Sequence, residues 1–328
     1  MSSTKNKDGI KNSGLIYRKI SKDTRPDVPA APPEKSPQDF KIIGKYTKRI
    51  DGVKIVTGKA PYTHDINLKD MLHGKILRSP HPKAEILSID LSRAKAHPGV
   101  KAAIELDVKK VRYIGDKIAA VAAVDVKTAA EALKLIQVDY KPLPYAVTEA
   151  KSKEEGSPQV HDDKPNIFKF NDQKRGDAEA GFEDADEVVE HTYRTPVEIH
   201  HPAETHSSIA KWRGDHLTVW DSTQGIHSVR DGLAGALQIP ISKVKVIKHY
   251  MGGGFGSKLF LCEHTVVAAL LARECKKPVK IVLSRKENAL CVGNRPSSLQ
   301  TYKGGIKKDG TLTAFSLVNY TCGGLDTG

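Results

Sequence analysis

A run of seven small and aliphatic side chains, Ile118–Val124, constrains the fold more than any other feature of this sequence. The run is far shorter than the roughly 20 apolar residues that cross a membrane. Its continuous apolar character is typical of a strand that is buried on both faces. Thr128 and Glu131 then have the spacing of a capping box, and apolar residues recur after them at helical intervals. We therefore expect a buried strand followed by a helix from about residue 128 to 137.

Composition divides the chain into four segments. Residues 1–40 carry five prolines and few large apolar side chains. Such a segment buries too little surface to offset its ordering entropy, so we expect a disordered arm. Residues 41–150 predict a compact domain of mixed helices and strands, and residues 151–187 are polar and predict a linker. Residues 188–328 predict a second domain.

Strand and helix patterns alternate through this second domain, with strands at residues 217–220, 244–250 and 279–283 and helices at 226–237 and 266–273. Residues 302–319 predict a hairpin that turns at Asp309 and Gly310. Residues 320–328 follow its second strand directly, without a closing helix. We expect this domain to be incomplete at its C-terminus, or to be completed by another chain.

The charge balance of 52 basic against 39 acidic residues gives a net charge of +13. A basic chain can bind nucleic acid, membranes or small anions. The lysines are dispersed and aromatic residues amount to 6%, so aromatic platforms for single-stranded nucleic acid are not evident. We expect a solvated lysine-rich surface, no nucleic-acid partner and no membrane span. Four cysteines without a C-x-x-C pair and an N-terminus without an apolar secretory stretch favour the cytoplasm, with co-export to the periplasm as the alternative.

The strongest local signal is the glycine-rich segment Met251–Lys258, MGGGFGSK, which lies between a predicted strand and a predicted helix. Glycines permit positive φ angles and close backbone approach, and a helix N-terminus favours anions. A Walker A loop is excluded because Ser257 precedes Lys258 where glycine is needed, and because Leu259 replaces the hydroxyl residue. The dinucleotide motif G-x-G-x-x-G also fails at Ser257. Two interpretations stay open, a tight structural turn and a cofactor site.

Other polar residues near strand ends are weaker candidates. Gln224 lies between a predicted strand and helix and offers both a donor and an acceptor. Arg295 precedes a proline, which holds its backbone extended. Taken alone, each pattern favours a solvated surface residue over a functional one. A zinc site is not expected in the segment 198–206, which lacks the H-E-x-x-H pattern although it holds His200, His201 and His206.

Together, these motifs resemble the molybdenum-binding large subunit of the xanthine dehydrogenase/aldehyde oxidase family. The segments similar to its α/β hammerhead domain are residues 44–65, 74–82, 97–100, 111–116 and 138–144. The segments similar to its molybdopterin-binding domain begin at about residue 190 and include 222–224, 252–258 and 285–295.

This resemblance implies an α+β fold with mixed α/β character. A hammerhead domain at 41–150 would precede the first part of a molybdopterin-binding domain at 188–328. It also implies an oxidoreductase that hydroxylates an aldehyde or an aromatic heterocycle with water as the oxygen source. The cofactor would be molybdenum–molybdopterin or its cytosine dinucleotide form. Electrons would pass to iron–sulfur clusters and FAD on partner subunits.

The resemblance further implies roles for individual residues of the cofactor site. Gln224 would donate a hydrogen bond to an oxygen ligand of molybdenum, and Phe255 would lie beside the metal. Both side chains would lie near the metal without bonding to it directly. The remaining cofactor contacts would come from the loop backbone at Gly252, Gly253, Gly254 and Gly256.

Two further positions concern the substrate. Arg295 would bind the substrate and polarise it where negative charge develops. Leu259 stands where purine-oxidising members carry a glutamate, and a leucine cannot hydrogen-bond a purine. The resemblance therefore favours an aldehyde or a less polar aromatic substrate over xanthine.

The family's general-base glutamate lies in the C-terminal half of the full-length subunit, so no catalytic residue is expected among these 328. The isolated chain is accordingly expected to be inactive. The alternative function is a non-catalytic fragment, or an assembly or binding module with the same fold. A nucleotide- or nucleic-acid-binding protein is a third hypothesis, which the failed phosphate motifs disfavour.

Overall fold

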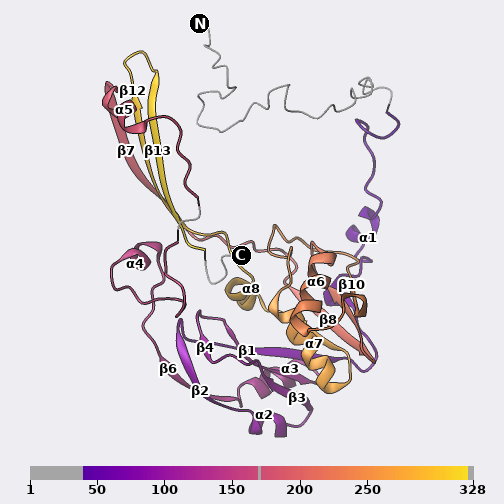
Figure 1. The fold of residues 1–328 in the computed structure, drawn as a ribbon. Helices are drawn as coiled ribbons and strands as arrows, with labels where there is room; N and C mark the ends of the chain where they lie inside the picture. The colour runs from indigo at the N-terminus through magenta and orange to yellow at the C-terminus, as the bar shows by residue number, and fades with distance from the viewer. Residues whose placement is uncertain (1–39, 169–170, 324–328) are drawn as a thin grey trace. The chain divides into compact units, whose positions relative to one another are not determined.

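The computed structural model describes residues 40–168 and 171–323 (Figure 1). Except for residue 40, the arm predicted at 1–40 lies outside these residues. The described chain forms two compact units. The smaller unit takes the residues before Ala60 together with Arg175–His191 and Tyr302–Ser316, and the larger unit takes the rest.

A seven-stranded mixed sheet organises the larger unit. Its strands in spatial order are β10 (Val244–Ile247), β9 (His216–Asp221), β8 (Ser207–Arg213), β11 (Val279–Val282), β1 (Leu72–Arg78), β5 (Lys117–Ala123) and β3 (Val100–Glu105). The pairs β10–β9 and β1–β11 are parallel, and the other neighbours are antiparallel. The sheet thus joins strands from both of the predicted domains.

Residues 118–123 of the apolar run form strand β5 as predicted and are completely buried, whereas Val124 lies after the strand and is 48% exposed. The helix after it, α3 (Val126–Leu133), begins two residues earlier than expected and ends four residues before the predicted end at 137, where strand β6 begins. Asp125 caps this helix because its side chain accepts the backbone N–H of Thr128 at 2.7 Å. The predicted capping box between Thr128 and Glu131 is therefore wrong, since the better acceptor lies three residues before Thr128.

A smaller antiparallel sheet lies beside this strand–helix unit. Its order is β4 (Lys110–Val111), β2 (Ala84–Asp90) and β6 (Gln137–Pro142). The short helix α2 (Ser92–Ala96) follows β2, and α2 and α3 both contact β3. The shared core consists of alanine, valine, leucine and isoleucine side chains, which require tight packing because alanine fills little volume.

A second core lies where α7 (Glu263–Cys275) packs on β8 and β11 and where α6 (Ile226–Leu237) packs on β10. These elements confirm the predicted helix at 226–237 and the predicted strands at 217–220 and 279–283. Strand β10 ends at Ile247, and Tyr250 instead forms an isolated parallel bridge with Tyr62. The remaining short elements are η3 (Thr63–Asp65), η4 (Ile241–Lys243), α4 (Glu149–Lys153) and α8 (Arg285–Cys291).

The sheet β13-β12-β7 contains β13 (Leu312–Thr321), β12 (Ser298–Ile306) and β7 (Glu187–Thr195). The β12–β13 turn contains Asp309 and Gly310, as predicted, and Gly310 has a φ of +84°. Helix α5 (Ala178–Glu183) belongs to the smaller unit and contacts β13, since a Cβ at Gly181 would lie 2.6 Å from the Thr313 carbonyl oxygen. The domain boundaries expected at 150 and 188 stay predictions.

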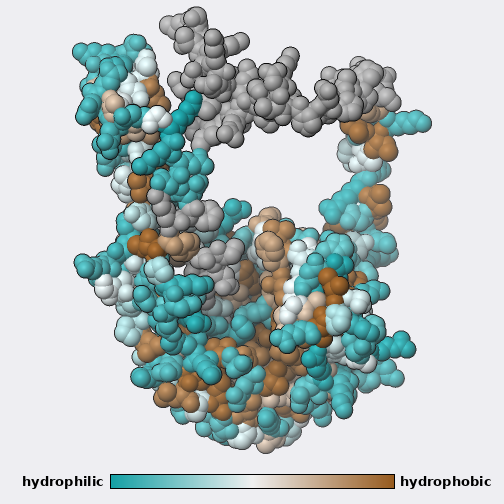
Figure 2. Space-filling view, in the orientation of Figure 1, coloured by the Kyte–Doolittle hydropathy of each residue, from teal (hydrophilic) through white to brown (hydrophobic). Residues whose placement is uncertain are grey.

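The N-terminal part of the smaller unit includes α1 (Gly52–Val56), which has no buried residue. Hydrophilic side chains cover much of the visible surface, with hydrophobic ones showing between them (Figure 2). Throughout the described part of the chain, the helices are too short or too polar to cross a lipid bilayer.

Candidate functional site

The glycine-rich loop, Met251–Lys258, connects β10 to α7 in the larger unit. Helix α7 starts only at Glu263, so four residues separate the loop from the helix. The loop therefore presents its own backbone rather than the first turn of a helix. Phe255 adopts a φ of +53°, an uncommon conformation for a side chain other than glycine, and it is 64% exposed.

Glycine is required at Gly254 by close packing against a neighbouring side chain. A Cβ at this position would lie 2.4 Å from the Oε1 atom of Gln224, well inside van der Waals contact. A larger residue would displace either the Gln224 side chain or the loop backbone. The sequence motif is therefore explained locally by the approach of the loop backbone to the end of strand β9.

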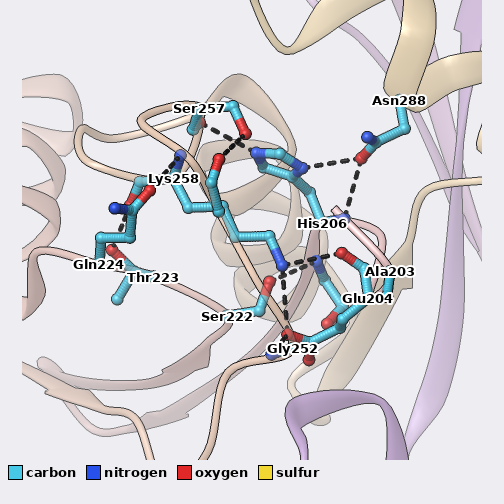
Figure 3. A network of polar contacts seen from close by, with 12 residues as sticks. Ala203, Glu204, His206, Ser222, Thr223, Gln224, Gly252, Ser257, Lys258 and Asn288 are labelled. Atoms are coloured by element: carbon cyan, nitrogen blue, oxygen red, sulfur yellow. Dashed lines mark hydrogen bonds and ion pairs between the residues drawn. The ribbon is translucent and has the colours of Figure 1, made fainter. Parts of the chain in front are cut away.

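Gln224 follows β9 and is bound to the loop through its side chain and its backbone (Figure 3). Its Oε1 atom accepts N–H groups of Gly256 at 2.9 Å and of Lys258 at 3.4 Å. Its backbone N–H donates to the Lys258 carbonyl at 2.7 Å, and the Thr223 hydroxyl donates to the same carbonyl at 2.9 Å. Because the loop holds the amide oxygen, the amide NH₂ group remains as a fixed pair of donors.

Both ends of the loop are attached to Glu204. The Lys258 ammonium is completely buried and donates to the Glu204 backbone carbonyl at 2.9 Å and to its carboxylate at 3.1 Å. The same carboxylate accepts the Gly252 N–H at 2.8 Å, and the Glu204 N–H donates to the Gly252 carbonyl at 3.0 Å. Burial lowers the pKa of Lys258, and the negative charge of Glu204 opposes that shift. Figure 3 shows this ion pair between Lys258 and Glu204, with Gly252 beside Glu204.

His206 links the loop to helix α8. Its Nε2 atom lies 3.0 Å from the Ser257 carbonyl oxygen. Its Nδ1 atom lies 2.7 Å from the Asn288 Oδ1 atom, which also accepts the His206 backbone N–H at 3.0 Å. His206 is 1% exposed, and burial is the main cause of its lowered pKa.

A buried acid and a second buried imidazole lie behind this network. Asp221 ends β9, and its Oδ2 atom accepts hydroxyl hydrogen bonds from Ser208 and Thr265, both at 2.7 Å. Burial raises the pKa of Asp221 to about 6. His264 meets the ring of His206 edge-on at 5.7 Å, and neither of its nitrogen atoms has a hydrogen-bond partner among the described residues.

Arg295 reaches this region through its backbone. It forms an antiparallel bridge with Glu198, with hydrogen bonds of 2.7 and 3.1 Å, while its side chain is exposed. His200, two residues further on, has a pKa lowered first by burial and then by the charge of Arg295. His200 in turn neighbours Gly256, because a Cβ there would lie 3.7 Å from its Nε2 atom. The structure thus brings Gln224, the loop and Arg295 into one region.

Leu259 directly follows the loop and is 41% exposed, and its neighbour Phe260 is 73% exposed. The structure therefore places apolar side chains, and no carboxylate, at the position noted in the sequence. Within the described ranges, no three His, Cys, Asp or Glu side chains are grouped so that they could hold a metal ion directly.

Sequence reasoning did not identify Glu204 and His206 as the residues that hold the loop, nor Asn288 as the residue that positions His206. Glu204 and His206 lie in the segment 198–206, whose pattern was weighed for zinc and for strand or loop structure near a functional cleft. The available signal was Lys258 within the loop motif. A lysine that is buried in the fold is almost always paired with an acidic side chain. The sequence does not show which acidic residue supplies that pairing.

Comparison with known proteins identifies both parts of the chain. Residues 160–327 match the molybdopterin cofactor-binding domain. Residues 57–108 and 105–144 match the a/b hammerhead domain of aldehyde oxidase and xanthine dehydrogenase.

Among curated proteins, the large molybdopterin subunit of nicotinate dehydrogenase from Eubacterium barkeri is 36% identical over 297 residues, which cover 84% of this chain and 69% of that protein. The molybdenum-binding subunit PaoC of an Escherichia coli K12 aldehyde oxidoreductase is 33% identical over 309 residues, covering 88% and 41%. A probable xanthine dehydrogenase subunit of Bacillus subtilis is 36% identical over 294 residues, covering 83% and 39%. The chain thus spans from about two-fifths to about two-thirds of these relatives.

Solved structures agree with this assignment. Quinoline 2-oxidoreductase from Pseudomonas putida 86 superposes with a TM-score of 0.76 at 26% identity, covering 84% of this chain and 39% of that one. The CO dehydrogenase of Oligotropha carboxidovorans gives a TM-score of 0.76 at 29% identity, with the same coverage. The chain therefore belongs to the xanthine dehydrogenase/aldehyde oxidase family of molybdenum-binding subunits.

Proposed function

We propose that this chain forms the part of a molybdenum hydroxylase subunit that binds the molybdenum–molybdopterin cofactor from the side of the glycine-rich loop. The enzyme would oxidise an aldehyde or an aromatic heterocycle, with water as the oxygen source. The observation that carries the proposal is the position of Gln224. Two loop N–H groups hold its amide oxygen at 2.9 and 3.4 Å, so its NH₂ group is a preorganised donor.

The residues present fit such a cofactor better than they fit a bare metal ion. Divalent metals take anionic carboxylate or thiolate ligands or imidazole ligands, and the described residues hold no such group of three. Amide donors such as Gln224 and the loop backbone instead suit oxygen atoms on a metal and the heteroatoms of a pterin. The chemistry of the site is therefore hydrogen bonding to a bound group, supplied by Gln224 and the backbone of Gly253 and Gly254. The backbone of Gly252 and Gly256 would adjoin that group, while their N–H groups donate to Glu204 and Gln224.

The bound cofactor would supply the two-electron oxidation of carbon. Gln224 would hold an oxygen atom of the cofactor in place, with Phe255 beside it. The ion pair of Glu204 and Lys258 would keep the loop from moving when the ligand binds, since it fixes both loop ends. Arg295 would stabilise negative charge that develops on a substrate oxygen or nitrogen.

The exposed apolar residues near the loop favour a substrate of low polarity. Phe255, Leu259 and Phe260 are 64%, 41% and 73% exposed, and they would pack against an aromatic ring or an alkyl chain while excluding water. Two curated relatives are described as a nicotinate dehydrogenase and an aldehyde oxidoreductase. By analogy with such large subunits, we propose iron–sulfur and FAD partner subunits, a molybdopterin or cytosine dinucleotide cofactor, and a cytoplasmic location.

The test uses the enzyme purified with its native partner subunits from cells that make the cofactor. Metal analysis and the fluorescence of released pterin should show about one molybdenum and one pterin per chain. Turnover of benzaldehyde or quinoline in ¹⁸O-labelled water should place the label in the product. Arg295→Met should lower kcat/KM severalfold or more and leave the molybdenum content unchanged.

Two results would contradict this proposal. A purified complex without molybdenum and pterin would favour the alternative, a non-catalytic assembly or binding module with the same fold. Loss of molybdenum from Arg295→Met would show that Arg295 supports the site structurally and does not bind the substrate.

A further inference from the structure

His200 lies beside the glycine-rich loop, and the roles assigned above do not use its ring. Glycine at position 256 leaves the space in front of this ring open. If a Cβ stood there, the described atoms within 4 Å of it outside the adjoining residues would be the Nε2 atom of His200 at 3.7 Å and its Cδ2 atom at 4.0 Å. The Nε2 edge of the imidazole therefore faces the α-carbon of Gly256, where glycine contributes no side chain.

The other ring nitrogen of His200, Nδ1, indicates which nitrogen carries the hydrogen. The Nδ1 atom of His200 is buried and has no hydrogen-bond partner among the described residues. A buried N–H group without an acceptor is rarer and less favourable than a buried acceptor without a donor. Burial and the nearby charge of Arg295 also lower the pKa of His200, which favours the neutral ring. We therefore assign the single ring hydrogen to Nε2, the nitrogen that lies nearest to Gly256.

Gln224 approaches Gly256 as well. Its Oε1 atom accepts the Gly256 N–H at 2.9 Å, while the His200 ring lies near the α-carbon of the same glycine. Two neutral donors, the Gln224 NH₂ group and the His200 Nε2–H group, thus belong to residues that adjoin one glycine. Neutral donors suit an oxygen acceptor, because they bind it without adding a net charge.

We propose that His200 is an additional ligand-contacting residue, whose Nε2–H group donates to an oxygen atom of the group bound over Gly256. This inference rests on the proposed function. The acceptor is an oxygen atom either of the cofactor or of the substrate, and the experiment separates these two sources.

The experiment compares two amide replacements in the holoenzyme. His200→Gln places an N–H donor near the original Nε2 position, whereas His200→Asn places its polar atoms near the Nδ1 position. Both remove the ring and have similar polarity, so each controls for the other. The His200→Gln variant should behave nearly as the wild type does. The His200→Asn variant should lose roughly three- to tenfold in binding of the cofactor or of the substrate, which corresponds to one hydrogen bond.

The readout identifies the acceptor. If the oxygen belongs to the cofactor, molybdenum and pterin content fall in His200→Asn and recover in His200→Gln. If it belongs to the substrate, cofactor content is unchanged and the KM for benzaldehyde rises in His200→Asn alone. Equal behaviour of the two variants, in content and in KM, would overturn the inference.

A spectroscopic measurement separates this inference from the proposed function. In ¹⁵N-histidine-labelled protein, the signals that His200→Gln removes should have the shifts of a ring protonated at Nε2 only. A ring protonated at Nδ1 overturns the inference even if the enzyme contains molybdenum. A wild-type complex without molybdenum, in contrast, overturns the proposed function, whatever the tautomer of His200.

Discussion

The two hydrophobic cores of the larger unit differ in the polar groups buried with them. Between Ala84 and Ile136, a stretch described throughout, Asp116 is the one buried side chain that is polar or charged. The core around β8, β9 and α7 is different, because the polar and charged side chains buried in or beside it include His206, Ser207, Ser208, Asp221, Ser222, Thr223, Lys258, His264, Thr265 and Asn288. The first region is a packed scaffold, and the second buries groups that destabilise a fold unless they are paired.

The buried polar groups are concentrated where a loop without regular structure must be held in place. Strands and helices satisfy their own backbone groups, but the loop Met251–Lys258 does not. Side chains of Glu204, His206, Thr223 and Gln224 accept from or donate to its backbone instead. Several buried polar side chains of the second region therefore position one loop, whereas the aliphatic core provides stability without such groups.

The largest predicted effect comes from removing the buried charge of this second region. Lys258→Met deletes the ammonium that pairs with Glu204 and leaves that carboxylate almost buried, with its side chain 10% exposed. Breaking a buried pair in this way costs about 3–5 kcal/mol. Urea unfolding of the purified protein should show a decrease of that size in the free energy of unfolding.

A second substitution tests whether the pair itself is responsible. Glu204→Gln keeps an oxygen for the Gly252 N–H while it removes the charge. The double variant should lose less free energy of unfolding than the two single variants lose in sum. The difference should be about 0.5–3 kcal/mol, because neither charge is then left unpaired. Strictly additive effects would mean that the two side chains act independently and that the comparison is wrong.

The sequence predicts the scaffold much better than it predicts this network. Continuous or periodic apolar patterns are sufficient for β5, β9, β11 and α6, because burial alone dictates those patterns. The motif at 251–258 and Gln224 could also be found as candidates. The partner of Lys258, however, lies 54 residues away at Glu204, and no local pattern records a pairing that arises only when β8 and the loop meet. The cap at Asp125 was missed for a different reason, since Thr128 and Glu131 offered a competing pattern.

The second prediction compares the buried acids of the two regions. Burial raises the pKa of Asp221 to about 6, from an ordinary value of 3.8. The native state therefore holds a proton that the unfolded chain releases, so this stabilisation is present below pH 4 and is lost as the pH rises to about 6. The loss amounts to at most about 3 kcal/mol, at 1.36 kcal/mol for each pKa unit.

Asp221→Asn stays neutral and keeps an oxygen for the hydroxyls of Ser208 and Thr265. Relative to the wild type, its free energy of unfolding should rise between pH 4 and pH 7. Asp116→Asn is the matched variant in the aliphatic region. Burial raises the pKa of Asp116 too, but the N–H groups of Arg112 and Lys117 stabilise its charged form, so its effect should be smaller. A larger rise in the free energy of unfolding for Asp116→Asn than for Asp221→Asn would contradict the proposed difference between the two regions.

The smallest predicted effect lies in the aliphatic core. Ile118 is completely buried in β5, and Ile118→Val removes one methylene group without introducing a polar atom. The expected loss is about 0.5–1.5 kcal/mol in the free energy of unfolding, and it should not depend on pH because no titrating group is involved. Molybdenum and pterin content should stay at the wild-type level in the folded enzyme. If the cofactor content fell below the wild-type level, packing in the scaffold would influence the loop, and stability and site geometry could not be assigned to separate regions.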